Sequence, residues 1–397
     1  DVLGSRGLGD VYKRQEQYLL HTKSNHPDRS QINRLSPCGR VDAILSLVQR
    51  QMEQRVQRQQ FNRQKRRLLR LAAEQMDALG GAMKELSQDL QHQGRELPQL
   101  EKQTAALLAE LDLEADWICC RWEEEKRLIL ELALPNVELP SIAKLTRHLS
   151  LGLEQPLQAA EPVEVRNQKL LRFFSPPPLE LEVGCCQMEK ETGQPCGDTF
   201  LAFQDGYGLW YLFLADGMGT GTLAAQDSQA LAGLAQELLA SGLHPSAVLR
   251  FCSNCLEYSL SAESCCAVDL LCLNLYESTA DLYKLGGASS ALLNGKEVQF
   301  WDNHQLPLGV LEQRHYECQT MNFSSNSRIY LWSDGMNLPQ KVLESLLVQL
   351  DSLSPKAAAK RLAELAVQFH GKGEEDDITV VVLQIHPVSA QPEETSL

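Results

Sequence analysis

Leu214-Ala-Asp-Gly-Met-Gly-Thr-Gly221 is the stretch of sequence that decides the fold. The apolar run at 209–213 leads into it, so we expect a buried strand that ends at Asp216 and then turns through three glycines. Glycine at these positions lets backbone, water or a metal ion approach closely. We therefore expect the buried strand to hold the carboxylate of Asp216 in a fixed position at the edge of the core.

Acidic residues recur at the ends of other strand-like segments. The apolar run at 328–332 leads to Asp334, Asp376 comes just before the apolar stretch 378–385, and Asp198 precedes another strand. A single Asp-Gly pair is usually a turn. Repetition at several strand ends weakens that interpretation and favours a common site.

The chemistry of this set is that of oxygen ligands. No His or Cys pattern accompanies Asp198, Asp216, Asp334 and Asp376, and hard divalent cations prefer oxygen. Two such ions share a bridging carboxylate, and the ligands must come from separate chain segments. We expect the backbone carbonyl of Gly217 to add a further oxygen. The glycines do not fit a nucleotide loop, because their spacing is not G-x-G-x-x-G.

The length and the net charge of the chain limit the classes of protein to which it can belong. The chain has 397 residues and a formal net charge of −15, so it has room for two or three domains and is not expected to bind nucleic acid as a whole. No apolar run reaches the length of a membrane span, and no signal peptide is visible. Cys252 and Cys255 have C-x-x-C spacing, for which buried thiols in a reducing cytosol are favoured over zinc.

The chain divides into segments of different pattern. Residues 1–15 fit nothing that follows and lack an initiator Met, so we treat them as a non-native scar on a chain whose true N-terminus is missing. Hairpin strands and packed helices in the C-terminal half indicate an α+β fold with helices outside antiparallel sheets. The predicted order is a regulatory helical segment at 38–93, a small α/β unit at 97–155, a linker at 156–178, a catalytic domain at 179–388 and a disordered tail at 389–397.

Basic residues gather in the middle of the 38–93 segment, between Arg50 and Arg70. Two interpretations are open: the solvated face of a coiled-coil-like signalling helix, or a patch for anionic lipid or nucleic acid. Charge runs of this kind are usually solvated, so we favour the signalling helix.

Several motifs in the second half of the chain occur in the order of a known family. Residues 179–386 resemble the catalytic domain of the metal-dependent type-2C (PPM-type) serine/threonine protein phosphatases, in the bacterial branch of stage II sporulation protein E. The helix expected around Arg66 to Leu90, which includes the segment 71–76, also resembles the regulatory segment before that domain. The motifs are Cys196-Gly-Asp-Thr199, Ala215-Asp-Gly-Met-Gly-Thr-Gly221, Lys284-Leu-Gly-Gly-Ala288, Leu306-Pro-Leu-Gly-Val310, Ser333-Asp-Gly335 and Asp376-Asp-Ile-Thr-Val380.

The resemblance implies two stacked antiparallel sheets flanked by helices, and two Mn²⁺ or Mg²⁺ ions. Asp216 would bridge the ions, with Asp334 and Asp376 on one of them and Asp198 serving the other directly or through water. Asp216 and Asp198 would be the catalytic residues as well as metal ligands, alongside Gly217. A metal-bridged water would attack phosphorus.

The resemblance also implies partners. The substrate would be a phosphoserine on an anti-sigma-factor antagonist, whose dephosphorylation activates a sporulation sigma factor. Family members contact the cell-division protein FtsZ and are anchored by an N-terminal membrane region. This sequence shows no such region, so we expect a cytoplasmic domain that is anchored only through a segment outside it.

Three positions depart from the family pattern. Met218 stands where many eukaryotic relatives carry a histidine proposed as the leaving-group acid, so we expect a metal-bound water to supply that proton. Ser289 and Asn337 also differ and bear on substrate docking.

A second hypothesis, of another class, is a catalytically weak scaffold that acts through its helical region. A regulatory hypothesis links both: the 222–260 helices follow the Asp216 turn directly, so a shift in them would move a bridging ligand. We expect the 40–93 helix to bias that shift through formation of a homodimer.

Overall fold

The computed structural model describes most of the chain after residue 94. Contacts divide the chain into two units, 1–70 and 71–397, and every described residue belongs to the second. The expectations for 1–15, 38–93 and 389–397 therefore concern residues outside the described part. The described stretches are 95–123, 126–135, 139–165, 168–190, 196–217, 222–257, 265–302, 305–310, 316–369 and 376–388.

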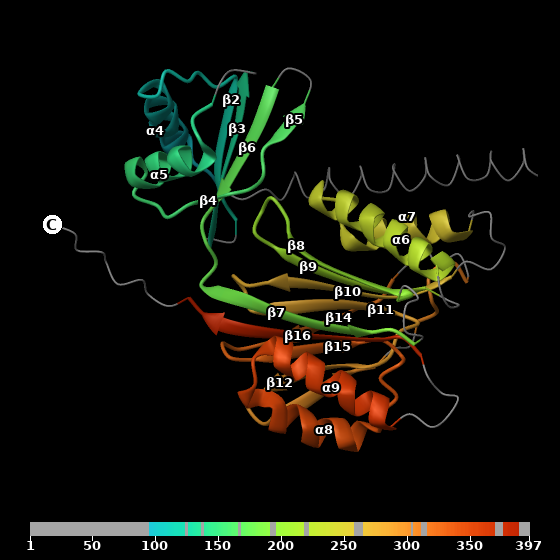
Figure 1. The fold of residues 1–397 in the computed structure, drawn as a ribbon. Helices are drawn as coiled ribbons and strands as arrows, with labels where there is room; N and C mark the ends of the chain where they lie inside the picture. Colours follow the sequence, from blue (N-terminus) through green and yellow to red (C-terminus); the bar gives the residue numbers. More distant parts are fainter. Residues whose placement is uncertain are drawn as a thin grey trace, which may run out of the picture. The chain divides into compact units, whose positions relative to one another are not determined.

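The first part of the second unit is a small α/β unit, residues 95–175. Its elements are β1 (Arg95–Glu96), α4 (Pro98–Ala109), β2 (Trp117–Glu123), β3 (Arg127–Pro135), α5 (Ile142–Gly152), β4 (Gln158–Ala159), β5 (Val163–Val165) and β6 (Gln168–Phe174). The sheet has the order β1-β2-β3-β6-β4, with β5 paired to β6. Helices α4 and α5 cover one face of this sheet (Figure 1), over a core that includes Leu108, Leu130 and Leu145.

The prediction that 156–178 is a linker is wrong for most of that stretch. It carries β4, β5 and β6, and β6 pairs with β3 from Ile129↔Phe174 to Pro135↔Gln168. The apolar alternation of β6 is short. The strand is followed by Ser175-Pro-Pro-Pro178, a sequence that is typical of a connection. Its partner β3 lies far away in sequence, so only the folded chain shows that this segment completes a sheet.

The C-terminal domain, residues 179–388, contains two five-stranded antiparallel sheets. Their strand orders are β14-β11-β10-β9-β8 and β13-β12-β15-β16-β7. The elements are β7 (Leu179–Met188), β8 (Asp198–Gln204), β9 (Trp210–Gly217), α6 (Thr222–Ala240), α7 (Pro245–Glu257), β10 (Cys266–Asn274), β11 (Thr279–Leu285), β12 (Ser290–Asn294), β13 (Glu297–Trp301), β14 (Cys318–Asn322), β15 (Arg328–Trp332), α8 (Gln340–Gln349), the 3₁₀ turn η1 (Leu350–Ser352), α9 (Pro355–Phe369) and β16 (Ile378–Pro387).

The two sheets of this domain are stacked, with a helix pair outside each (Figure 1). Residues such as Phe213 and Leu270 pack beneath α6 and α7, and residues such as Tyr330 and Val382 pack beneath α8 and α9. Alternate residues of the same strands, such as Leu271 in β10, point the other way and fill the layer between the sheets. The structure is thus the predicted arrangement of two antiparallel sheets flanked by helices.

The layer between the sheets changes character along the strands. Its middle is apolar, with leucine, isoleucine and valine from both sheets. By strand alternation, the residues that continue the same faces toward one end are polar. A hydrogen bond from Gln187 Nε2 to the Asp198 carbonyl, 3.2 Å long, joins the two sheets there. These polar residues are Gln187, Asp198, Asp216, Asp269, Lys284, Ser290, Ser333 and Thr379.

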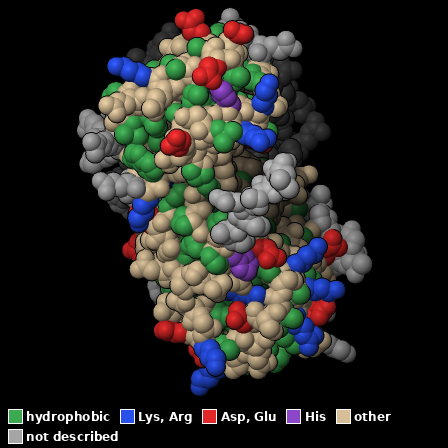
Figure 2. All heavy atoms as spheres, turned by 90° about the vertical axis from the view of Figure 1, so that its left-hand side faces the viewer, with side chains coloured by type: hydrophobic (Ala, Val, Ile, Leu, Met, Phe, Trp, Pro, Cys, Tyr) green, Lys and Arg blue, Asp and Glu red, His purple; other side chains and the backbone are tan. Residues whose placement is uncertain are grey.

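None of the described helices is both long and apolar enough to cross a membrane. Figure 2 shows one face of the molecule, on which acidic, basic and hydrophobic side chains of the described residues are interspersed rather than gathered into a patch of one kind. On this face the described residues therefore offer no continuous basic surface of the kind that binds a phosphate backbone.

Candidate metal centre

The β8–β9 hairpin places two of the predicted carboxylates opposite each other. The pairing runs from Gln204↔Trp210 near the turn to Asp198↔Asp216 at the open end. Side chains directly opposite in an antiparallel pair are close, and like charges there repel. The ladder therefore holds two carboxylates together at a real electrostatic cost.

Burial and neighbouring charge perturb both carboxyl groups. Burial raises the pKa of Asp216 to about 9, with further contributions from the negative charges of Asp198 and Asp334. Burial also raises the pKa of Asp198, and hydrogen bonds from Thr379 and Ser333 oppose part of that shift. A group whose pKa is raised resists ionisation, so a cation that offsets the repulsion would stabilise the charged forms.

Asp334 approaches this pair from the other sheet. It is the second residue after the end of β15, and its charge is one of the causes of the raised pKa of Asp216. Ser333, one residue earlier, ties the end of β15 to β16: its N–H donates to the Thr379 carbonyl at 3.0 Å, and its Oγ accepts from the Thr379 N–H at 2.9 Å. A Cβ at Gly335 would come 2.1 Å from the Asp377 carbonyl oxygen, so glycine is needed for this close approach.

The two aspartates before β16, Asp376 and Asp377, make different contacts. Asp376 is exposed, and its Oδ1 accepts from the Asp377 N–H at 3.0 Å and lies 3.8 Å from the Lys190 ammonium. Asp377 instead accepts from the backbone N–H groups of Gly197 and Lys190, each at 2.7 Å. Asp377 therefore holds the chain beside Asp198, a role that the sequence did not indicate. The assignment of Asp376 as a metal ligand stays a prediction.

Gly217 ends β9 against the start of α6. A Cβ there would come 2.5 Å from the carbonyl oxygen of Ala224, so the helix could not pack this closely on a larger residue. Its N–H donates to the Gly197 carbonyl at 3.5 Å. The rest of the signature turn, 218–221, lies outside the described residues, and the Gly217 carbonyl as a ligand remains a prediction.

The donor chemistry fits a hard divalent cation, while the positions are not yet those of a formed coordination sphere. Within the described stretches, no group of three or more Asp, Glu, His or Cys side chains is arranged so that it could hold an ion. Oδ2 of Asp198 is nevertheless buried and has no hydrogen-bond partner among these residues. A buried carboxylate oxygen without a partner, facing a second carboxylate, is costly unless a cation or proton compensates it.

A second polar group in the same layer was not singled out as a site by sequence reasoning. Lys284 Nζ donates to Asp269 Oδ2 at 2.6 Å and to Ser290 Oγ at 2.9 Å, which connects β10 and β11 to β12 of the facing sheet. Both ends of this ion pair are almost fully buried. The signal in the sequence was a single Lys in an apolar strand, within the motif 284–288.

The C-x-x-C pair lies on α7. Cys252 is fully buried beneath the helix, whereas Cys255 is half-buried. Burial raises the pKa of the Cys252 thiol, so this residue packs as a neutral apolar side chain.

Comparisons with known proteins find relatives in one family. Residues 206–386 match the model of the family described as "Stage II sporulation protein E (SpoIIE)". The chain is 22% identical over 327 residues to stage II sporulation protein E of Bacillus subtilis (strain 168), covering 80% of this chain. The chain is thus a distant homologue of the SpoIIE proteins, and residues 206–386 are the part that the family model matches.

A second relative has a similarly low sequence identity to this chain. Stage II sporulation protein E of Priestia megaterium is 19% identical over 364 residues, covering 88% of this chain. The chain spans 40% of the Bacillus subtilis protein and 62% of the Priestia megaterium protein.

A solved structure shares the fold. It contains the PP2C phosphatase domain and a fragment of the regulatory domain of SpoIIE from Bacillus subtilis, with a TM-score of 0.58 and 18% identity. The match covers 82% of this chain and 98% of that one. At this identity the likeness concerns the fold, and it confirms the predicted α+β class.

Proposed function

We propose that this chain is a metal-dependent protein serine phosphatase. The observation that supports this most is the pair Asp198 and Asp216, held opposite each other at the polar end of the layer between the sheets, with Asp334 near enough to perturb Asp216. Homology to the SpoIIE proteins supports the same class of reaction.

The proposal gives each site residue a role. Asp216 bridges two ions, Asp334 and Asp376 bind one of them, and Asp198 serves the other directly or through water. The Gly217 carbonyl adds an oxygen. Bound Mn²⁺ or Mg²⁺ supplies hydroxide near neutral pH and offsets the charge of the phosphate.

Neighbouring residues prepare these ligands. The hydroxyls of Thr379 and Ser333 lower the pKa of the Asp198 carboxyl and so favour its charged form. Asp377 holds the backbone at Gly197, and Gln187 holds the carbonyl of Asp198 itself. Together these contacts restrict the movement of an edge strand at the point where it carries a ligand.

The proposed substrate is a phosphoserine on an anti-sigma-factor antagonist, and the proposed role is activation of a sporulation sigma factor. The names of the SpoIIE relatives support a role in sporulation. A contact with FtsZ belongs to the same proposal and is supported by the family resemblance. A homodimer formed through the 40–93 helix is proposed as well.

The test is hydrolysis of a phosphoserine peptide with Mn²⁺, with Mg²⁺ and with excess chelator. Wild type should be active only with metal, and Asp216→Asn should be inactive in all three conditions. Asp112→Asn is the matched control, because Asp112 is exposed in the small unit and its φ of 56° suits asparagine. Equal rates in chelator, or full activity of Asp216→Asn, would contradict the proposal.

The alternative is a catalytically weak scaffold. It is favoured by one observation, namely that the described carboxylates do not converge as a formed ion site. Calorimetric titration with Mn²⁺ separates the two functions: no heat of binding at millimolar metal supports the scaffold, and saturable binding that Asp216→Asn abolishes supports the enzyme.

A further inference from the structure

The turn of the β8–β9 hairpin, residues 205–209, contacts the small unit at the end opposite to the carboxylates. Arg172 of β6 packs its guanidinium 3.8 Å from the centre of the Tyr207 ring, within the range of a cation–π contact. Its Nε also donates to Glu131 Oε1 at 2.8 Å, which fixes the direction of the side chain. A Cβ at Gly206 would come 2.3 Å from Arg172 Nη1, so a larger residue at 206 would displace the guanidinium from its present position.

A second arginine of the small unit holds the same turn. Arg127 Nη1 donates to the Tyr207 carbonyl at 2.8 Å, and its guanidinium lies 5.2 Å from the centre of the Tyr276 ring. Arg127 also pairs with Glu123. The hydroxyl of Tyr276 in turn donates to the Ser175 carbonyl at 2.6 Å, at the end of the small unit.

Inside the turn, Asp205 is buried, and one of its carboxylate oxygens accepts two backbone hydrogen bonds. Its Oδ1 accepts from the N–H groups of Tyr207 and Leu209, at 2.8 Å and 2.9 Å. Burial raises the pKa of Asp205, while these backbone hydrogen bonds and the charges of Arg127 and Arg172 favour its ionised form. The turn is therefore rigid, and it is tied to cations that belong to the small unit.

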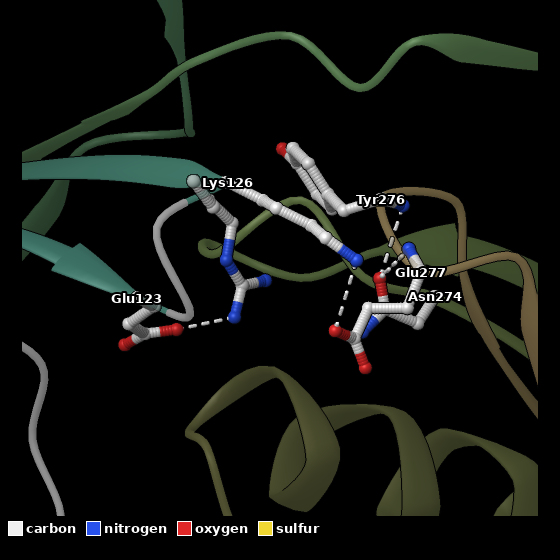
Figure 3. A pocket seen from close by; sticks show the side chains of 6 residues that line it. Glu123, Lys126, Asn274, Tyr276 and Glu277 are labelled. Carbon is white, nitrogen blue, oxygen red and sulfur yellow. Dashed lines mark hydrogen bonds and ion pairs between the residues drawn. The ribbon is translucent and has the colours of Figure 1, made fainter.

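A shallow pocket lies at the edge of this contact region (Figure 3). There Lys126 points toward Glu277, and their charged atoms are 3.5 Å apart. Glu123, on the opposite side, makes an ion pair with Arg127. Because both cations already have acidic partners, this pocket lacks the net positive charge that would attract an anionic ligand. We interpret it as the open edge of a contact between two parts of the chain.

We propose that Arg172 and Tyr207 are positioning residues for the metal centre, acting through the β8–β9 hairpin. We call Arg172, Arg127, Tyr207 and Asp205 the hairpin clamp. The inference rests on the proposed function in one respect only: Asp198 and Asp216 are taken as the metal ligands.

The topology gives the physical reason. Strand β8 lies at the edge of its sheet, so β9 is its single strand partner among the described elements. Its seven residues span about 20 Å, with Asp198 at one end and the clamped turn at the other. An edge strand held at both ends has little freedom to slide or tilt. Release of the turn would therefore let Asp198 move relative to Asp216, and small displacements of ligands have large effects on metal sites.

The experiment uses the full chain and compares Tyr207→Ala with Tyr207→Phe. Mn²⁺ affinity is measured by calorimetry, which does not depend on turnover. Tyr207→Ala removes the ring under Arg172 and should weaken Mn²⁺ binding about fivefold, the lower end of couplings between distant sites. Tyr207→Phe keeps the ring and should bind like wild type. Equal affinity in wild type and Tyr207→Ala would overturn the proposal.

Two controls separate positioning from a general loss of stability. Lys126→Ala removes an exposed ion pair of the same contact region and should leave Mn²⁺ affinity unchanged. Leu347→Ala destabilises the core beneath α8, away from the hairpin, and should also leave it unchanged at a temperature where the variant is folded. If Leu347→Ala weakened Mn²⁺ binding as much as Tyr207→Ala does, the effect of the clamp would be one of general stability. That result would overturn the proposal.

A metal-independent measurement distinguishes failure of this inference from failure of the proposed function. If wild type binds no Mn²⁺, the proposed function fails, and amide hydrogen exchange in peptides covering 196–204 and 209–217 still tests the clamp. Faster exchange near Asp198 in Tyr207→Ala, but not in Tyr207→Phe, supports control of β8 by the turn. Unchanged exchange overturns it.

Discussion

Each end of the β8–β9 hairpin buries an aspartate, and the two aspartates differ in their hydrogen bonds and in the charge of their neighbours. At the turn, Asp205 is 6% exposed, accepts two backbone hydrogen bonds and lies near Arg127 and Arg172. At the open end, Asp198 is 5% exposed, has one oxygen without a hydrogen-bond partner among the described residues, and faces Asp216.

Equal burial thus serves different purposes. A buried carboxylate that accepts backbone hydrogen bonds and lies near arginines stabilises the fold, because its desolvation is offset locally. A buried carboxylate left incomplete beside another costs stability, and proteins retain such arrangements mainly at functional sites. The comparison therefore supports a structural role for Asp205 and the proposed functional role for Asp198.

The largest expected effect comes from Asp198→Asn. Loss of a proposed metal ligand should remove several kcal/mol of transition-state stabilisation and lower kcat/KM about 1,000-fold. The free energy of unfolding in chelator should stay equal or rise, because the substitution removes repulsion with Asp216. Phosphopeptide kinetics and urea denaturation measure the two quantities. A clear loss of stability with activity retained would reverse the roles assigned to the two ends.

A third buried carboxylate, Asp269, sharpens the comparison because it is paired with a lysine. Lys284 and Asp269 are 1% and 2% exposed, so Lys284→Met would leave a buried charge alone and should cost about 3 kcal/mol of unfolding free energy. The double variant Lys284→Met, Asp269→Leu should recover most of that loss. A double variant as unstable as the single one would mean that the two charges do not act as a pair.

Asp205→Asn is the matched counterpart of Asp198→Asn at the other end of the hairpin. The amide oxygen can still accept from the backbone, but the charge facing two arginines is lost, so we expect a loss of about 2 kcal/mol in unfolding free energy. Activity of the folded fraction should fall far less than in Asp198→Asn. If the comparison is right, Asp198→Asn loses activity and keeps stability, whereas Asp205→Asn loses stability and keeps most of its activity.

The smallest effect is expected from Lys126→Ala. Its ion pair with Glu277 is 3.5 Å long between side chains that are 55% and 32% exposed, so its contribution should be below about 0.5 kcal/mol. Thermal unfolding at low and high salt measures it. A larger loss would show that the exposed edge of the contact region matters as much as the buried clamp.

Sequence reasoning proposed those residues of the candidate site that a local pattern reveals. Asp216 and Asp334 were identified because an apolar strand followed by Asp-Gly is visible within one segment. The direct pairing of Asp198 with Asp216 was not, because the register of a hairpin depends on both strands and their turn. Asp377 escaped notice as the residue that anchors Gly197, since its partners lie about 180 residues away.

The same limit explains the error in the small unit. The stretch that contains β6 has a short apolar alternation beside prolines, and these local signals favour a connection. Its pairing with β3 becomes evident only when both strands lie in one sheet. The clamp shows the same dependence, because Arg172 and Tyr207 are ordinary surface types in isolation.

The sequence by itself determined the class of the protein: strands and helices of an α+β domain, aspartates at strand ends, and motifs in the order of the SpoIIE family. Such features are encoded within short windows, where periodicity and turn chemistry act. The tertiary structure alone decided which carboxylates oppose each other, which are neutralised by arginine or lysine, and how the small unit holds the hairpin. Those properties arise from pairings between distant segments, where burial sets the energy of each charge.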